Sequence, residues 1–120
     1  MLKVFGLFRR KPGLSREDFV AHYENSHAAL GVKYLPTMTY YARHYLCPVA
    51  EPIDGAVAEP AYDVITELHF ADRAGFEAAL AAIQQPEARD ALTADEERLF
   101  DRPFNRLVIV ETRESDLGRS

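Results

Sequence analysis

The chain has 120 residues and a mass of 13.6 kDa, with 48% hydrophobic and 28% charged residues, a composition typical of one globular domain. Its net charge of −5 disfavours a nucleic-acid-binding protein, because such proteins need clustered Lys and Arg. No apolar run approaches the roughly 18 residues that span a bilayer, no signal-peptide pattern is present, and one cysteine, Cys47, leaves no intramolecular disulfide. We therefore expect a cytoplasmic protein without nucleic-acid or membrane partners.

The first part of the chain predicts a strand, a turn, a helix and a second strand. Residues 2–8 are rich in strand formers, and Lys11-Pro12-Gly13 is a tight-turn sequence. Ser15 is typical of a helix N-cap and Gly31 of a helix end, and residues 38–46 predict the second strand. Helical spacing places five residues on the core-facing side: Phe19, Val20, Tyr23, His27 and Leu30.

A surface loop and an alternating strand follow. Residues 48–60 contain three prolines and little periodicity, as loops do. Residues 62–70 alternate, so one face is predicted to carry Tyr62, Val64, Thr66, Leu68 and Phe70. The other face is predicted to carry Asp63, Ile65, Glu67 and His69.

The last part of the chain predicts a helix, a helical turn and a strand. Asp72 is expected to be the N-cap of a helix, and Pro86 is expected to end that helix. Thr93 and Glu96 resemble a capping pair that starts a short turn through Phe100. Residues 107–110 predict the final strand.

This order of elements predicts an α+β fold, a ferredoxin-like βαββαβ sandwich with an antiparallel sheet and helices on one face. We assign residues 1–112 to this domain and residues 113–120 to a polar C-terminal tail. The other sheet face would leave a partly apolar surface in water, and such surfaces mark interfaces. We therefore expect a homodimer in which two sheets pair face to face around a cavity.

Residues 8–30 resemble the N-terminal half of EthD-domain proteins. The shared pattern is a strand, a Lys-Pro-Gly turn, Ser15, and then a helix that reads Phe-x-x-His-aromatic-x-x-x-His-small-x-Leu. The likeness in layout covers residues 2–112, with Tyr23 where many relatives have Trp. The resemblance implies a dimeric α/β-barrel fold. It also implies dehydration of aromatic, polyketide-type intermediates or an accessory role in ether degradation.

Histidines and carboxylates are the candidate acid/base groups. On the core-facing side of its helix, His27 is either a structural hydrogen-bonding group or a catalytic acid/base. His22 lies about 140° from it around a regular α-helix, which argues against a two-histidine metal clamp, and we expect no metal. His69 shares a strand face with Asp63 and Glu67, which would either line the dimer cavity or form structural ion pairs with Arg43 or Arg106.

Aromatic side chains are the candidate substrate-binding groups. Tyrosines offer a flat apolar surface with a polar end, which suits a phenolic ligand, although such residues also fill cores. The sequence has no phosphate-binding, flavin or iron–sulfur motif, and we expect no cofactor. The predicted substrate-binding residues are Tyr23, Tyr34, Tyr41, His44, Asp63, Glu67 and Phe8.

Three functions are consistent with these residues. The first is a cofactor-free lyase of the dehydratase or cyclase type, acting on an aromatic or polyketide-like small molecule. His27 would be its base, with His22, Tyr45 or His69 as partner. The second is a non-catalytic small-molecule-binding or accessory protein of a degradation pathway. The third is a cofactor-free or haem-linked monooxygenase.

Overall fold

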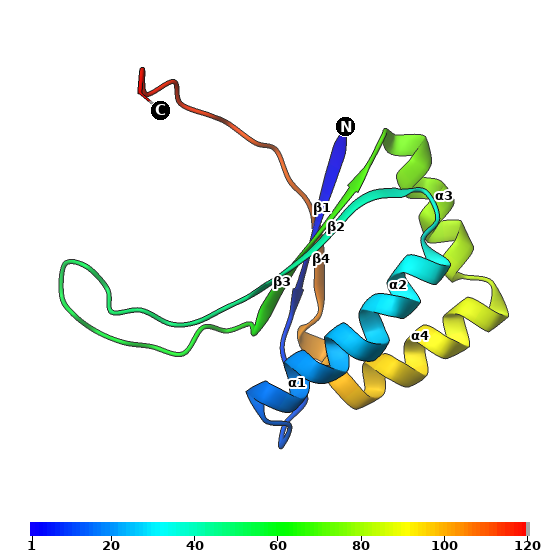
Figure 1. Cartoon of the computed structure of the whole chain (residues 1–120), viewed down its shortest axis with the longest axis horizontal. Coiled ribbons are helices and arrows are strands. Elements are labelled where there is room, and N and C mark those ends of the chain that lie inside the picture. The colour runs from blue at the N-terminus through cyan, green and yellow to red at the C-terminus, as the bar shows by residue number, and fades with distance from the viewer. Residues whose placement is uncertain (120) are drawn as a thin grey trace.

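A four-stranded antiparallel sheet carries all the helices on one of its faces (Figure 1). The structure is a computed structural model and describes residues 1–119. The strands lie in the order β2-β3-β1-β4, which confirms the predicted ferredoxin-like α+β fold. Their bounds are β1 Leu2–Phe8, β2 Met38–Tyr45, β3 Val64–Phe70 and β4 Arg106–Ile109.

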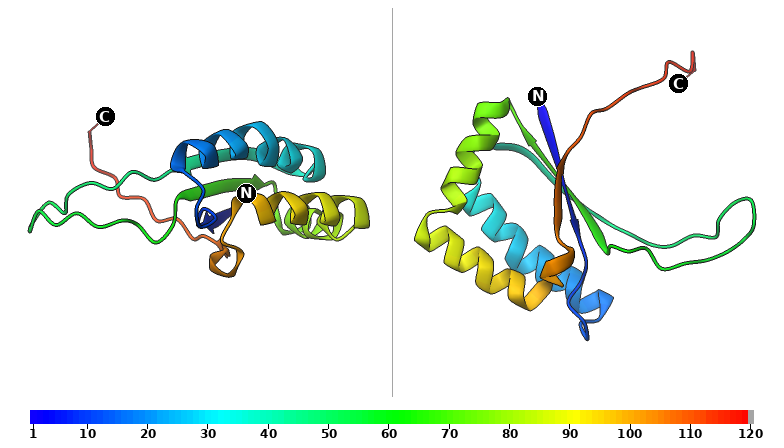
Figure 2. Two further views of the ribbon diagram at one scale, coloured as in Figure 1. Left: turned by 90° about the horizontal axis from the view of Figure 1, so that it is seen from below. Right: turned by 180° about the vertical axis from the view of Figure 1, so that it is seen from behind.

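The two faces of the sheet differ as strand alternation predicts. On β3, Val64, Thr66 and Phe70 are buried beneath the helices, and the register pairs Thr66 with Gly6 of β1. The opposite face, called here the helix-free face, is covered by none of the helices in residues 1–119 (Figure 2). Strand alternation and pairing place these residues on it: Phe5, Leu7, Tyr40, His44, Ile65, Glu67, His69 and Val108.

The first helical segment runs without a break from Arg16 to Tyr34. It consists of α1 (Arg16–His22), the π-helical turn η1 (Tyr23–His27) and α2 (Ala28–Tyr34). The Ser15 hydroxyl accepts a hydrogen bond from the Asp18 N–H at 3.1 Å, which confirms the predicted N-cap. The predicted end at Gly31 is wrong. Gly31 lies inside α2, where a Cβ would approach the Tyr41 hydroxyl to 2.8 Å, so the glycine serves close packing.

Two helices, α3 and α4, follow β3, and the second of them is longer than the sequence predicts. Asp72 caps α3 (Arg73–Ile83) as predicted, accepting from the Gly75 N–H at 2.8 Å. This helix ends before Pro86, as predicted. Pro86 also begins α4 (Pro86–Leu99), so the predicted separate turn from Thr93 is wrong. Proline is favoured at the first helical position, because the N–H that it lacks has no partner there. A short 3-10 turn, η2 (Arg102–Phe104), leads into β4.

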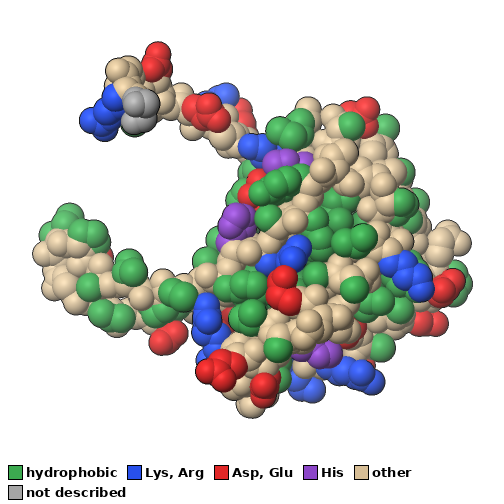
Figure 3. Space-filling view, viewed as in Figure 1, with side chains coloured by type: hydrophobic (Ala, Val, Ile, Leu, Met, Phe, Trp, Pro, Cys, Tyr) green, Lys and Arg blue, Asp and Glu red, His purple; other side chains and the backbone are tan. Residues whose placement is uncertain are grey.

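Two segments extend away from this body on the side opposite α3 and α4 (Figures 1 and 3). One is the loop between β2 and β3, whose residues 47–61 are all exposed, which confirms the predicted surface loop. The other comprises residues 111–119, which form no helix or strand. No helix in residues 1–119 has the length and apolar character needed to cross a bilayer.

Candidate functional site

A cavity of about 460 Å³ lies between the helix-covered face of the sheet and the helices. Its volume is in the range of sites that bind small organic molecules. Most of its wall is apolar, and ten lining residues carry polar or titratable side chains: Tyr23, His27, Tyr41, Thr66, Gln84, Arg89, Thr93, Glu96, Asn105 and Arg106. The cavity is therefore suited to an apolar ligand that carries a few polar groups.

His27, the last residue of the π-helical turn, lies in the wall of this cavity and is only 8% exposed. Its Nδ1 is hydrogen-bonded to Asp95 Oδ2 at 2.8 Å, and no hydrogen bond within residues 1–119 involves its Nε2. The rings of Tyr23 and Phe100 meet the imidazole edge to face, each at a centroid distance of 5.3 Å. The imidazole is thus fixed on one side and unbonded on the other.

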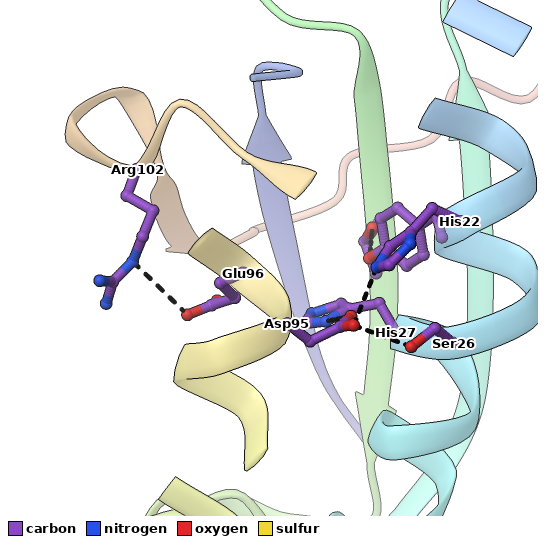
Figure 4. A network of polar contacts seen from close by, with 8 residues as sticks. His22, Ser26, His27, Asp95, Glu96 and Arg102 are labelled. Carbon is purple, nitrogen blue, oxygen red and sulfur yellow. Dashed lines mark hydrogen bonds and ion pairs between the residues drawn. The ribbon is translucent and has the colours of Figure 1, made fainter. Parts of the chain in front are cut away.

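Asp95, on α4, is the centre of a buried polar network (Figure 4). Its Oδ1 accepts from the Ser26 hydroxyl and bonds His22 Nε2, both at 2.8 Å, while its Oδ2 bonds His27. Burial acts to raise the pKa of Asp95, but the hydrogen bonds from Ser26, His22 and His27 outweigh it and lower the pKa. Asp95 is therefore an ionised acceptor that holds the His27 Nδ1–H.

The shared bonds to Asp95 show that His22 and His27 lie on the same side of their helix, in contrast to our prediction. In the π-helical turn the Ala28 N–H bonds to the Tyr23 carbonyl, five residues earlier. This wider turn brings positions five apart nearly into line. Within residues 1–119, no group of three or more His, Cys, Asp or Glu side chains is arranged to hold a metal ion.

The protonation of His27 suits a general base. Burial lowers its pKa below the ordinary value of 6.5, against the opposing influence of Asp95. Near pH 7 the ring is therefore neutral, with its proton on Nδ1 toward Asp95 and a lone pair on Nε2. Such a ring can take a proton from a molecule in the cavity.

The cavity also holds groups that can donate protons. The Tyr23 hydroxyl bonds to the Thr66 hydroxyl at 2.6 Å, and burial raises the pKa values of Tyr23 and Tyr41. Burial also raises the pKa of Glu96. The nearby Arg102, whose Nε lies 3.9 Å from Glu96 Oε2, offsets this rise only in part. Figure 4 shows Glu96 directed toward Arg102 and away from the Asp95 network. The tyrosine hydroxyls are therefore the candidate proton donors of the cavity.

Three predicted site residues lie on the helix-free face and not in this cavity. Glu67 Oε1 bonds His44 Nε2 at 3.0 Å, and its Oε2 bonds His69 Nε2 at 2.5 Å. The predicted alternative, ion pairing of these strand carboxylates with Arg43 or Arg106, is wrong. Arg43 pairs with Glu24 at 2.7 Å, and Arg106 donates to the backbone carbonyls of Pro103 and Asn105. Asp63 does not join this cluster, since it accepts from the Arg10 N–H at 2.8 Å.

The predicted aromatic residues are divided among several places. Phe8 and Tyr41 line the cavity beside Tyr23, and Phe8 stacks on Phe100 at 4.5 Å. The Tyr45 hydroxyl instead donates to Glu24 at 2.6 Å, and burial together with this carboxylate raises the pKa of Tyr45. The Tyr34 hydroxyl donates to Glu87 at the surface.

Sequence reasoning missed Asp95 and Glu96 as site residues. Once α4 is seen to begin at Pro86, its buried positions repeat at helical spacing through Ala88, Asp95 and Leu99. A carboxylate on such a buried stripe needs a partner, and this signal would have identified Asp95.

Comparison with known proteins gives a family and a set of related folds. The sequence profile of the EthD domain matches residues 11–103. An EthD family protein of Bacillus halodurans is 20% identical, with a TM-score of 0.64 over 94% of this chain and 99% of its own. No functionally curated protein matches the sequence.

Two further solved structures share the fold. A dimeric ferredoxin-like protein of unknown function from Thermobifida fusca is 20% identical, with a TM-score of 0.57 over 92% of this chain and 90% of its own. SnoaB from Streptomyces nogalater, a cofactor-independent oxygenase, is 13% identical, with a TM-score of 0.57 over 95% of this chain and 94% of its own.

Proposed function

The chain belongs to the EthD-domain family, and we propose that it is an acid/base lyase of the dehydratase or cyclase type. Its substrate would be an aromatic or polyketide-like small molecule bound in the cavity between sheet and helices. One observation carries this proposal: His27, neutral and held through Nδ1 by Asp95, lines the cavity with an unbonded Nε2. This arrangement orients a base toward a substrate.

The proposed dehydration uses side chains of this chain alone. His27 Nε2 takes a proton from the carbon next to a substrate carbonyl, and the electron pair of the broken C–H bond forms an enolate. The enolate then forms a C=C bond and expels the β-hydroxyl, which takes the proton of the Tyr41 hydroxyl in the cavity wall and leaves as water. Asp95 stabilises the imidazolium formed at His27, and proton exchange with solvent restores both side chains.

The cavity wall supports an aromatic substrate. Phe8, Tyr23 and Tyr41 present flat rings, and buried tyrosine hydroxyls can donate hydrogen bonds to a carbonyl or phenol oxygen. A cofactor-free oxygenase is the second candidate, favoured by the structural likeness to SnoaB. The same base would then deprotonate a phenol or enol that reacts with O₂, and oxygen consumption distinguishes the two reactions.

We also propose that residues 1–112 form the dimerising domain and that two copies pair through their helix-free faces. Phe5, Leu7 and Ile65 would otherwise present apolar surface there, and a similar fold from Thermobifida fusca is dimeric. Sedimentation of the purified chain over a range of concentrations tests this pairing.

The catalytic proposal is tested with two matched variants, His27→Gln and His69→Gln. Each is assayed for water loss from a panel of aromatic β-hydroxyketones, with folding checked by circular dichroism. We expect His27→Gln to lose about 10²–10⁴-fold in kcat/KM, the usual worth of a general base, and His69→Gln to retain the wild-type rate. Equal losses in the two variants would contradict the assignment. Probe binding without turnover by the wild type would instead indicate an accessory binding protein.

A further inference from the structure

We propose that the loop between β2 and β3, residues 47–62 and called here the arm, clasps the body of a second copy of this chain. The inference rests on the proposed homodimer and adds to it a contact outside the paired sheet faces. It assigns a partner to a segment that has almost no packing in its own protomer.

The first observation is the place of the arm. It leaves the body on the side opposite α3 and α4, as do residues 111–119 (Figures 1 and 3). The radius of gyration is 16.2 Å, against about 13.6 Å for a compact chain of this length. The arm therefore extends beyond the protomer toward the side on which a second copy would sit.

The second observation is that the tip of the arm has a defined shape. The Glu51 N–H donates to the Ala56 carbonyl at 2.7 Å, and the Gly55 N–H donates to the Glu51 carbonyl at 2.8 Å. The Glu51 side chain accepts from the N–H groups of Ile53 and Asp54 at 2.9 and 2.8 Å, and Gly55 has a φ of 74°. These bonds fix a turn that would present the same surface to any partner.

The third observation is what this turn presents. Ile53, at the tip, is 94% exposed, and Val49 and Val57 on the two limbs are 81% and 67% exposed. Three apolar side chains on an ordered, projecting turn favour contact with another apolar surface.

The reach of the arm favours a second copy seated on the helix-free face. Its base continues that sheet, because the Leu46 N–H bonds to the Asp63 carbonyl at 2.9 Å. Sixteen residues folded back on themselves extend about 25 Å, whereas two sheets packed face to face are about 10 Å apart. The arm is therefore long enough to extend past the partner's sheet, so that Ile53 can contact the side of the partner's folded domain.

The test measures dimer dissociation by analytical ultracentrifugation for the wild type, Ile53→Glu and Val32→Glu. Val32, on α2 in the helical layer, is 66% exposed and provides a matched control for a charge at an exposed apolar position. In a symmetric dimer the Ile53→Glu substitution is present in both copies, so both arms lose their apolar contact with the partner. We therefore expect its dissociation constant to rise about 100-fold, with Val32→Glu unchanged.

The possible outcomes separate this inference from the proposals on which it rests. A dimeric wild type whose dissociation constant is unaltered in Ile53→Glu, or equally altered in both variants, would overturn the clasp and leave the homodimer intact. A wild type that is monomeric at all concentrations would overturn both the clasp and the homodimer, while the lyase assay would still stand.

Discussion

The two faces of the sheet each carry a carboxylate held between two histidines. Asp95 bonds His22 and His27 beneath the helices, and Glu67 bonds His44 and His69 on the helix-free face. For both carboxylates, burial acts to raise the pKa and the hydrogen bonds outweigh it. The difference is the surroundings, since Asp95 is buried among helices whereas the Glu67 cluster lies where a second copy is proposed to pack. We therefore propose that the same arrangement of one carboxylate and two imidazoles contributes to folding and catalysis at one face and to association at the other.

The largest expected effect comes from removing each carboxylate in turn. Asp95→Ala leaves Ser26, His22 and His27 without an acceptor inside the fold, and we expect it to lower the free energy of unfolding by about 3 kcal/mol. Glu67→Ala is expected to lower the free energy of unfolding of a single protomer by less than about 1 kcal/mol, because His44 and His69 can bond to water when the carboxylate is removed. Urea unfolding measures both. Equal losses would contradict the contrast between the faces.

A smaller effect is expected from two tyrosines, one near each cluster. Tyr23→Phe removes the buried 2.6 Å bond to the Thr66 hydroxyl and should lower the free energy of unfolding by about 1 kcal/mol. Tyr40→Phe keeps the ring that stacks on His69 at 4.5 Å and should leave stability unchanged. Urea unfolding compares the two variants. A larger decrease in the free energy of unfolding for Tyr40→Phe than for Tyr23→Phe would contradict this prediction.

The smallest effect is expected from pH. The folded chain binds a proton at His27 less readily than the unfolded chain, whose histidine has a pKa of 6.5. The free energy of unfolding should therefore fall as the pH falls below 6.5, and His27→Gln should reduce this slope. The midpoint of the pH–rate profile of the proposed lyase should also lie below 6.5. An unchanged slope in His27→Gln would show that the imidazole is not the group responsible.

Local rules were enough to predict most of the fold. Alternation along residues 64–70 placed each side chain on its observed face, and the caps at Ser15 and Asp72 depend on atoms three residues away. Pro86 follows the end of α3 as predicted, but its second role, as the first residue of α4, was missed because proline both ends helices and begins them.

The site was harder to predict because its contacts are distant in the sequence. The position of His27 on the core-facing side was visible from helical spacing, but its partner Asp95 lies 68 residues away on a helix whose start was misplaced. Spacing also predicted His22 and His27 to diverge, since it assumes a regular α-helix. A π-helical turn changes that angle without any signal in the hydrophobic pattern.

The wide turn at Tyr23–His27 lets the helix hold one extra residue without changing the direction of the residues that follow. Deleting the exposed Asn25 would restore regular winding, and His22 and His27 would then be four positions apart, on the same side of the helix. Gly31 would also keep its place beside the Tyr41 hydroxyl. Deleting Ala29 in the regular α2 would instead rotate Gly31 by about 100° away from Tyr41. The helix therefore has a turn in which its length can change without altering the cavity.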